Sequence, residues 1–218
     1  LDLATGRFLT LRRTAFRGLA DPDGLRERAK AIKQRTLREL DRHLERLASE
    51  LTRAGGHIHF AADCRECADI VLRLARERGV RSVVKSKSMA SEEIHLNAAL
   101  EAAGITVVET DLGEWVIQLA KDPPSHIIAP AIHKTTRQIA ELFSTAVGEP
   151  LPPEPEVLTA AARRTLRQKF LQADMGISGA NFAVAETGTI GSVTNEGNGR
   201  LVTTLPRIHV AVMGMEKV

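Results

Sequence analysis

Short apolar runs alternate with helix-like segments from residue 57 onward, and this alternation constrains the fold more than any other feature of the chain. The expected strands are residues 57–61, 80–84, 105–109 and 126–129, and the expected helices are residues 62–78, 88–103, 111–120, 133–147 and 156–173. Strands that alternate with helices of this length are typical of βαβ units, whose strands run parallel. The sequence therefore predicts an α/β fold with a mainly parallel sheet flanked by helices.

The first 55 residues follow a different pattern. Apolar residues recur at steps of mostly three and four from Leu25 to Leu51, which predicts one long N-terminal helix that ends at Gly55-Gly56. We therefore expect two parts: an N-terminal helical segment, residues 1–55, packed on an α/β domain, residues 56–218. The charged side of the helix is expected to face solvent, and docking of another subunit is the alternative.

Composition argues against several classes of protein. The formal net charge is +3, and no Lys/Arg stripe interleaved with aromatic residues is present, so no nucleic-acid partner is predicted. No apolar run of about 18 residues and no signal peptide is found, so no membrane partner is predicted. The chain has 2 cysteines, too few for a disulfide framework, which favours a reducing, cytoplasmic compartment.

A Lys-Ser-Lys-Ser turn is the first candidate binding site. Lys85, Ser86, Lys87 and Ser88 follow one expected strand and precede the next expected helix. Ligands of open α/β sheets bind outside the carboxyl ends of the strands, and a helix N-terminus with two lysines suits a phosphate or carboxylate. The alternative is an ordinary turn that Ser88 caps and that neighbouring glutamates neutralise.

Three carboxylates lie within six residues at the end of the next expected strand. Asp111 is expected to cap a helix, whereas Glu109 and Glu114 are candidates to hold a cation, to orient a ribose hydroxyl or to pair with the lysines. Their spacing does not match a calcium-binding loop. No metal site is therefore predicted at these residues.

Two further motifs carry weaker signals. His126 and His133 are seven residues apart and do not match a zinc spacing, so each is a candidate proton donor or, more simply, a structural histidine. Cys64 and Cys67 form a CxxC motif, which can be redox-active or can bind a metal. Because no second pair accompanies it, we interpret this motif as accidental.

Residues 174–200 contain six glycines between short β-prone pieces. Tight hairpins are one interpretation, because glycine accepts positive φ. The other is a ligand-facing loop in which Glu186, at the end of a β-prone piece, is a catalytic nucleophile or general base. The ligand-binding residues expected beside it are Thr187, Gly188, Thr189 and Asn195.

Four motifs in order resemble one family. They are VVKSKSM at 83–89, VVETDLGEW at 107–115, PSHIIAPAIHK at 124–134 and ISGANFAVAETGTI at 177–190. Together they resemble the LUD domain of the lactate utilization protein B family, over roughly residues 25–218. The resemblance implies a fold of the NagB/RpiA/CoA-transferase-like type.

The same resemblance implies a function. Family members belong to a cytoplasmic complex that oxidises L-lactate to pyruvate with two other lactate-utilization subunits. They carry iron–sulfur clusters for electron transfer in a C-terminal ferredoxin-like domain. This sequence stops before such a domain, so we expect no cofactor in this chain and no activity of the chain by itself.

Three functions follow as hypotheses. In the first, the LUD domain binds a small anionic or nucleotide-like ligand between the Lys-Ser-Lys-Ser turn and the loop that contains Glu186. In the second, the chain is a CoA- or acyl-transferase-like enzyme with Glu186 as nucleophile, an analogy that rests on the fold alone. In the third, the chain is a non-catalytic scaffold subunit.

Overall fold

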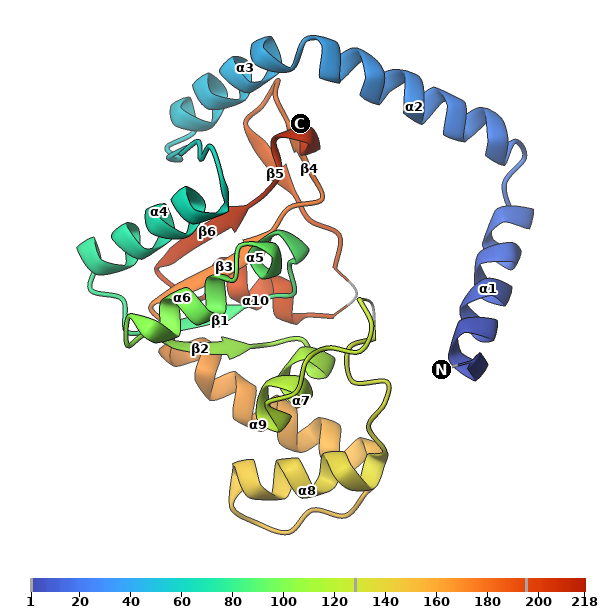
Figure 1. The fold of residues 1–218 in the computed structure, drawn as a ribbon, viewed down its shortest axis with the longest axis vertical. Coiled ribbons are helices and arrows are strands. Elements are labelled where there is room, and N and C mark those ends of the chain that lie inside the picture. Colours follow the sequence, from blue (N-terminus) through green and yellow to red (C-terminus); the bar gives the residue numbers. More distant parts are fainter. Residues whose placement is uncertain (1, 128, 195) are drawn as a thin grey trace. The chain divides into compact units, whose positions relative to one another are not determined.

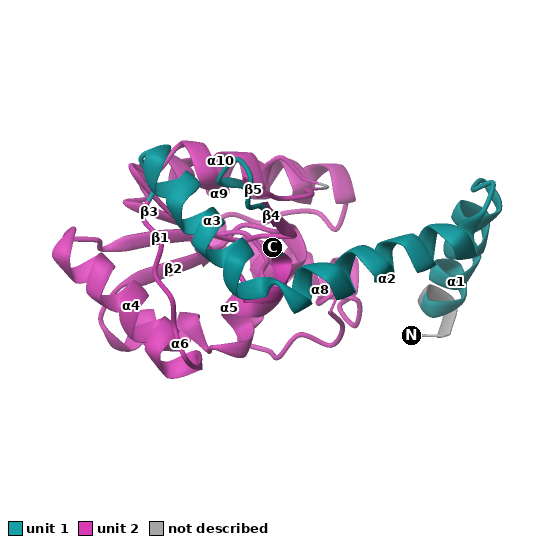
Figure 2. Ribbon diagram, turned by 90° about the horizontal axis from the view of Figure 1, so that it is seen from above, with its two compact units in different colours: residues 1–56, 184–189, 218 teal, residues 57–183, 190–217 magenta. Residues whose placement is uncertain are grey.

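A computed structural model describes residues 2–127, 129–194 and 196–218. The chain forms two compact units (Figure 2). The smaller unit contains residues 1–56, 184–189 and 218, and the larger contains residues 57–183 and 190–217. All four strands of the main sheet belong to the larger unit.

Three helices make up most of the smaller unit: α1 (Asp2–Arg17), α2 (Pro22–Arg38) and α3 (Leu40–Arg53). The single helix predicted from Leu25 to Leu51 is therefore wrong, because the chain leaves the helix at Glu39, whose N–H donates to Thr36 O. The apolar stripe explains the break. It takes a five-residue step from Ile32 to Leu37, so one straight helix cannot carry both halves of the stripe on one face.

Four parallel strands form the sheet in the order β2-β1-β3-β6 (Figure 1). The strands are β1 (Ser82–Lys85), β2 (Thr106–Glu109), β3 (Met175–Gly179) and β6 (Ile208–Val212). A separate two-stranded hairpin pairs β4 (Phe182–Val184) with β5 (Thr189–Gly191). The parallel sheet flanked by helices confirms the predicted α/β class.

Helices cover both faces of the sheet (Figure 1). One face packs against α4 (Cys64–Glu77), α5 (Met89–Glu93) and α6 (Leu96–Ala102). The other packs against α7 (Leu112–Ala120), α9 (Pro155–Gln172) and α10 (Asn198–Thr204), with α8 (Thr136–Val147) against α7 and α9. A short 3-10 helix, η1, spans Met215–Lys217.

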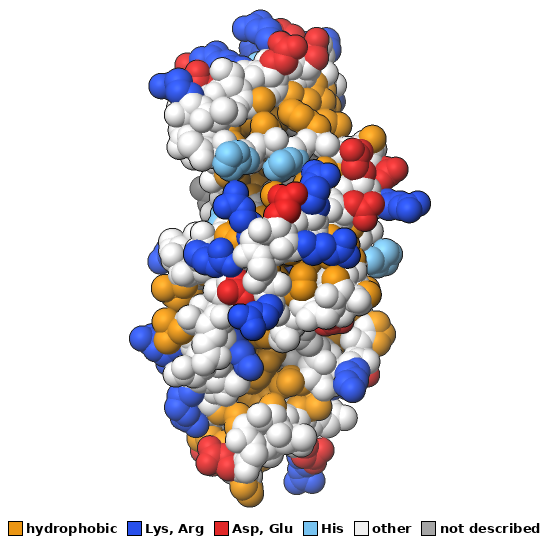
Figure 3. Space-filling view, turned by 90° about the vertical axis from the view of Figure 1, so that its left-hand side faces the viewer, with side chains coloured by type: hydrophobic (Ala, Val, Ile, Leu, Met, Phe, Trp, Pro, Cys, Tyr) orange, Lys and Arg blue, Asp and Glu red, His pale blue; other side chains and the backbone are white. Residues whose placement is uncertain are grey.

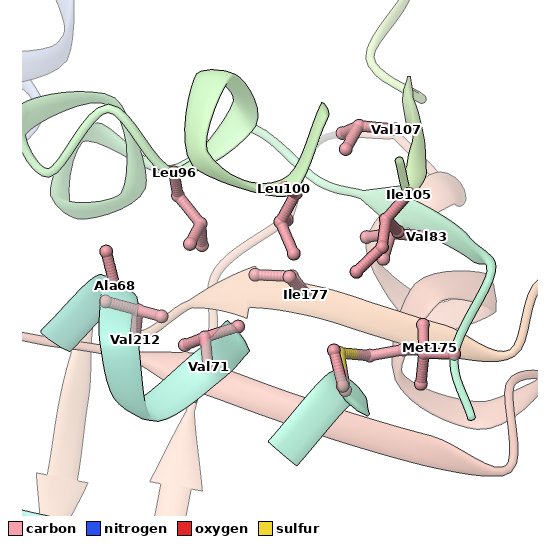
Figure 4. Packing of buried hydrophobic residues seen from close by; sticks show 12 residues of the cluster. Ala68, Val71, Val83, Leu96, Leu100, Ile105, Val107, Met175, Ile177 and Val212 are labelled. Carbon is pink, nitrogen blue, oxygen red and sulfur yellow. The ribbon is translucent and has the colours of Figure 1, made fainter. Parts of the chain in front are cut away.

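Aliphatic side chains fill the space between the sheet and the first helix layer. Figure 4 shows Val83, Met175 and Ile177 of the strands pointing toward Val71 of α4 and Leu100 of α6. All five side chains are at most 2% exposed. Burying a side chain of this size stabilises a fold by about 1.5–3 kcal/mol. This core fixes the ends of β1 and β2, where the candidate site lies.

Three further predicted elements differ from the structure. Residues 57–61 are not a strand and pair with none of the four strands of the sheet. The helix predicted at 88–103 is two helices, α5 and α6, because His95 adopts a left-handed conformation with φ 50°. The strand predicted at 126–129 is a loop at residues 126, 127 and 129, flanked by prolines that lack the N–H a strand needs; residue 128 lies outside the described residues.

β3 is a central strand that the glycine pattern concealed. The sequence suggests turns at Gly176 and Gly179, but both residues lie in this strand. A Cβ on Gly176 would lie 2.0 Å from Val202 O of α10. Glycine is thus required here because the helix backbone approaches the strand closely, not because the chain turns.

The surface carries charges of both signs. On the face shown in Figure 3, Lys and Arg side chains lie among Asp, Glu and hydrophobic side chains. Within the described part of the chain, no helix is both long enough and apolar enough to cross a membrane.

Candidate functional site

Lys85 ends β1 and is the centre of a buried polar cluster. Its side chain is 1% exposed, and its Nζ lies 2.9 Å from Glu109 Oε1. The Nζ also donates to Ser91 Oγ at 3.0 Å, and Asn97 Nδ2 donates to the same Glu109 oxygen at 2.7 Å. Lys85 and Glu109 are direct neighbours in the β1–β2 register. Of the roles considered for Glu109, pairing with a lysine is the one that the structure shows.

Some of the buried polar atoms around Glu109 lack a hydrogen-bond partner. Glu109 Oε2 and Asn97 Oδ1 are buried and have no hydrogen-bond partner. Burial raises the pKa of Glu109, and this outweighs the opposing effects of Lys85 and Asn97. The ammonium of Lys85 thus faces a carboxyl group inside the protein and not a ligand in solvent.

Lys87 lies two residues further on and reaches a cavity. Its side chain is 22% exposed and pairs with Glu114, and its Nζ lies 3.6 Å from Glu92 Oε1. Burial alone lowers the pKa of Lys87, but Glu114 and Glu92 together raise it above the ordinary value. Lys87 therefore remains a cation at the edge of the sheet.

Asp111 connects the loops after β1 and β2 to the start of α10, beside Lys87. Its Oδ2 accepts from Lys87 N at 2.6 Å and from Asn198 Nδ2 at 2.9 Å. Asn198 Nδ2 also donates to Thr110 Oγ1 at 3.2 Å. Asp111 is the N-cap residue of α7, although its side chain makes no capping hydrogen bond. These contacts hold the loops after β1 and β2 against the start of α10.

A cavity of about 230 Å³ opens between these loops. Its lining residues are Lys87, Asp111, Gly113, Glu114, Ala129, Pro130, Ala131 and Glu196. Burial and then the nearby Asp111 raise the pKa of Glu196, and a hydrogen bond from the Leu112 backbone opposes them. The lining charges are one ammonium and three carboxyl groups, so the cavity suits a small ligand with at most one negative charge.

Ser86 and Ser88 lie beside the start of the glycine-rich stretch. Ser86 N donates to Ile177 O at 3.0 Å, and Ser88 Oγ accepts from Ser91 N at 3.3 Å as the cap of α5. A Cβ on Gly179 would lie 2.7 Å from Ser88 Oγ. The structure thus brings Lys85, Ser86, Lys87, Ser88 and Glu109 together at the carboxyl edge of the sheet.

Residues 184–189 form the tip of the β4–β5 hairpin and belong to the smaller compact unit. Glu186 has an exposed side chain, and its Oε1 lies 3.5 Å from Arg46 NH2 of α3. Thr187 Oγ1 donates to Thr189 Oγ1 at 2.8 Å, and Gly188 turns the chain with φ 69°. The fourth predicted ligand-binding residue of this stretch, Asn195, lies outside the described residues.

The histidines and cysteines form no metal centre in the described chain. No group of three or more His, Cys, Asp or Glu side chains is placed to hold a metal ion among residues 2–127, 129–194 and 196–218. His133 Nδ1 lies 2.8 Å from Ser125 Oγ, and its Nε2 lies 3.7 Å from Asp122 Oδ2. Both histidine contacts are local to their loop.

Glu196 is the cavity residue that the sequence did not reveal. It stands between residue 195 and a glycine in a loop, and no spacing relates it to Asp111 or Lys87. Only the fold brings it to the start of α7. The chemistry available in the cavity is therefore binding and proton exchange by carboxyl groups beside one lysine.

Comparison with known proteins identifies relatives of the whole chain. Lactate utilization protein B of Bacillus licheniformis is 46% identical over 216 residues, which is 99% of this chain and 45% of that protein. The protein of the same name from Bacillus subtilis is 45% identical over 216 residues. The uncharacterized electron transport protein YkgF of Escherichia coli is 48% identical over 193 residues, 88% of this chain and 41% of that protein.

The matches also show how much of each relative the chain covers. It spans less than half the length of the curated relatives it matches. No solved structure matches the chain significantly. The LUD domain profile matches residues 44–218, which include the complete sheet and the cavity around Lys87. The chain therefore belongs to the LUD domain family.

Proposed function

We propose that this chain is part of an electron-transfer protein that takes part in the oxidation of L-lactate to pyruvate. Support comes from relatives called lactate utilization protein B and from one called an electron transport protein, each about 45–48% identical to it. Removal of the gene from its source organism should abolish growth on L-lactate as sole carbon source. Normal growth of the deletion strain on L-lactate would overturn this role.

Within that role, the cavity at the carboxyl edge of the sheet binds a small 2-hydroxy or 2-oxo acid. The observation that carries this proposal is the position of Lys87, a partly exposed cation beside three carboxyl groups in a cavity of about 230 Å³. Pockets for drug-sized ligands occupy about 300–1,000 Å³, so this one suits a smaller molecule. L-lactate offers one carboxylate for Lys87 and one hydroxyl for a neighbouring carboxyl oxygen.

The charge balance narrows the choice of ligand. Within the cavity, Lys87 is outnumbered by Asp111, Glu114 and Glu196, so a polyphosphate would meet net repulsion. A nucleotide-like ligand would therefore be bound through its ribose hydroxyls and not through its phosphates. Lys85 does not change this balance, because Glu109 already neutralises it.

NMR titration of the chain with L-lactate, pyruvate, adenosine and inorganic phosphate tests the proposal. L-lactate or pyruvate should shift the amide signals of residues 111–114 and 129–131. Lys87→Met should weaken this binding at least about tenfold, since a hydrogen bond to a charged group contributes about 1.5–3 kcal/mol.

Lys169→Met is the matched control, because Lys169 is exposed on α9 and lies outside the cavity. It should leave the shifts unchanged. Equal weakening by the two variants, or no shift with either acid, would remove this cavity from the function. If phosphate shifts these signals and Lys87→Met removes the shifts, the ligand of the cavity would be an anion that needs no hydroxyl group, and not a 2-hydroxy acid.

The donor set of the chain does not fit an iron–sulfur cluster. Most clusters are held by four thiolates and Rieske-type clusters by two thiolates and two histidines. The chain has 2 cysteines, and no group of three or more metal-ligating side chains is placed together among the described residues. We place the clusters of such a protein outside this sequence, in the part of the relatives that the chain does not span. Absorbance of the purified chain after reconstitution with iron and sulfide should therefore show no cluster band.

A scaffold role is the second candidate, because α2 has no buried residue. Leu25, Ile32 and Leu37 are 44%, 54% and 50% exposed. In this candidate, α2 docks another lactate-utilization subunit through these side chains.

Co-purification with that co-expressed subunit tests the scaffold role. Leu25→Asp/Ile32→Asp should abolish it, whereas Arg26→Asp/Lys33→Asp, a control on the same helix, should preserve most of it. Unchanged co-purification of the leucine–isoleucine variant would exclude this surface.

A further inference from the structure

Two thiols lie together on the first turn of α4, away from the cavity around Lys87. α4 begins at Cys64, and Cys67 follows three residues later, so both side chains lie on one side of the helix. Both are free thiols, and they are the 2 cysteines of the chain. Neither the LUD family match nor the proposed lactate chemistry gives this pair a role. The sequence alone suggests an accidental motif, but the placement of one exposed and one partly buried thiol on a single helical turn leads us to revise that interpretation.

The two thiols differ in their surroundings. Cys64 is exposed, whereas Cys67 is partly buried and packs against the hydrophobic cluster below α4. Burial, and secondarily the charge of Cys64, raises the pKa of Cys67. The spacing of three residues at the start of α4 places the two thiols side by side, and the difference in exposure means that a solute meets Cys64 first.

We propose that Cys64 and Cys67 form a reversible redox dithiol that reacts with small disulfides such as oxidised glutathione. The Cys64 thiolate attacks one sulfur of the glutathione disulfide, which forms a mixed disulfide and releases one glutathione thiolate. The Cys67 thiolate then attacks the Cys64 sulfur and releases the second glutathione. Two protein thiols and one oxidised glutathione thus give one protein disulfide and two reduced glutathione molecules.

The helix geometry makes this disulfide easy to reduce. Residues three apart in a helix have Cβ atoms about 5–6 Å apart, whereas a disulfide needs about 3.5–4.5 Å. The first helical turn can adjust, since its N–H groups lack partners four residues earlier. Here the turn is also held by Asp63, which accepts from Glu66 N at 2.8 Å. Closing the disulfide works against this cap, and a strained disulfide is more oxidising.

A third side chain would be needed for the alternative, a metal site. No group of three or more metal-ligating side chains occurs in the described part of the chain, and Cys64 and Cys67 supply only two ligands. A structural zinc ion takes four. Thiol–disulfide exchange therefore fits the pair better than metal binding.

Intact-mass analysis in glutathione buffers tests the proposal. The full chain is equilibrated over a range of reduced-to-oxidised ratios, quenched in acid and alkylated. The wild type should lose two hydrogen atoms and regain them with dithiothreitol. Cys67→Ser should stop at a Cys64–glutathione adduct, because the second thiol is missing. Cys64→Ser should react at least about tenfold more slowly, because the remaining thiol is partly buried.

Three results would overturn the proposal. They are a wild-type chain that stays fully reduced in oxidised glutathione, one that accumulates a stable glutathione adduct at Cys64, and one that forms only disulfides between chains on a non-reducing gel. Circular dichroism of both serine variants shows whether α4 and the fold remain intact. The Cys64→Ser/Cys67→Ser variant gives the unreactive baseline.

Discussion

The end of β1 and the tip of the β4–β5 hairpin were both predicted to contact a ligand, yet they lie in opposite surroundings. The Lys85 side chain is 1% exposed and pairs with a buried glutamate, whereas Glu186 is 75% exposed and pairs with an exposed arginine. In both places, a charged residue stands at the end of a β-prone run. What separates them is the preceding residues: Val83 and Val84 are fully buried strand residues, while Val184 is 36% exposed. The flanking residues thus predict burial better than the charged residue does.

Lys85→Met should produce the largest effect of the variants considered. It leaves Glu109 buried without its cation, and breaking a buried ion pair in this way costs about 3–5 kcal/mol. Urea denaturation followed by circular dichroism measures the free energy of unfolding. Lys169→Met, on the surface of α9, should change it by less than about 0.5 kcal/mol.

The double variant Lys85→Met/Glu109→Met sharpens the interpretation. If the cost arises from the unpaired Glu109 carboxylate, removal of both charges should recover at least about 1 kcal/mol of the loss. A double variant no more stable than Lys85→Met would mean that the cluster matters for packing and not for charge pairing.

Gly188→Ala should give the next largest effect, at the hairpin tip. Gly188 has φ 69°, and a Cβ there would lie 2.5 Å from Leu51 N of α3. Strain and backbone overlap together should cost about 2–3 kcal/mol. Gly104 is the matched control, since it has φ 78° but nothing within 4 Å of an added Cβ. Gly104→Ala should cost about 1 kcal/mol in the same urea experiment.

Equal losses for the two glycine variants would show that the contact between the tip and α3 contributes nothing beyond backbone strain. The tip would then be specified by its own turn alone. A larger loss for Gly188→Ala would show that an exposed segment can still be held firmly through its backbone, even where its charged side chain is free of close packing.

The buried Glu109 should make the free energy of unfolding depend on pH, and this effect should be smaller than those above. Because burial raises its pKa, the folded chain holds more protons than the unfolded chain between the ordinary and the raised pKa. Its contribution to stability is therefore full below the ordinary pKa of a glutamate and decreases as the pH rises toward the raised one. Glu109→Gln removes this titration, so the wild type should lose stability relative to the variant from about pH 4 upward. A difference that is independent of pH would contradict the raised pKa.

The local sequence pattern predicted most of the strands and helices, because in those segments the periodicity of apolar residues matches the burial of the side chains. β1, β2, α4, α7, α8 and α9 all occur close to their predicted ranges. The misses occur where backbone approach decides the structure. Gly176 signals a turn in the sequence but provides room for α10 beside a central strand, and His95 interrupts a helix without any glycine or proline. Such contacts between distant segments leave no periodic signal.

The site was predicted in part for the same reason. Lys85 and Glu109 end β1 and β2, and Lys87 lies two residues after β1, so the parallel sheet alone brings them to one edge. Glu196 reaches the cavity through a loop before α10, and the packing of that helix against β3 determines its position. Sequence thus identifies residues placed by the sheet, whereas residues placed by loops require the structure.

Glu186→Ala should give the smallest effect, less than about 0.5 kcal/mol in the urea experiment, because an exposed ion pair at 3.5 Å contributes little. The variant also tests the transferase hypothesis. An acyl-CoA followed by hydroxylamine would leave a hydroxamate on a nucleophilic carboxylate, and we expect none, since the Glu186 side chain is 75% exposed and pairs with Arg46. A hydroxamate on Glu186 that the alanine variant lacks would establish Glu186 as a nucleophile. Exposure at the hairpin tip would then indicate a group placed to meet a large thioester, and the buried Lys85 cluster would be purely structural by comparison.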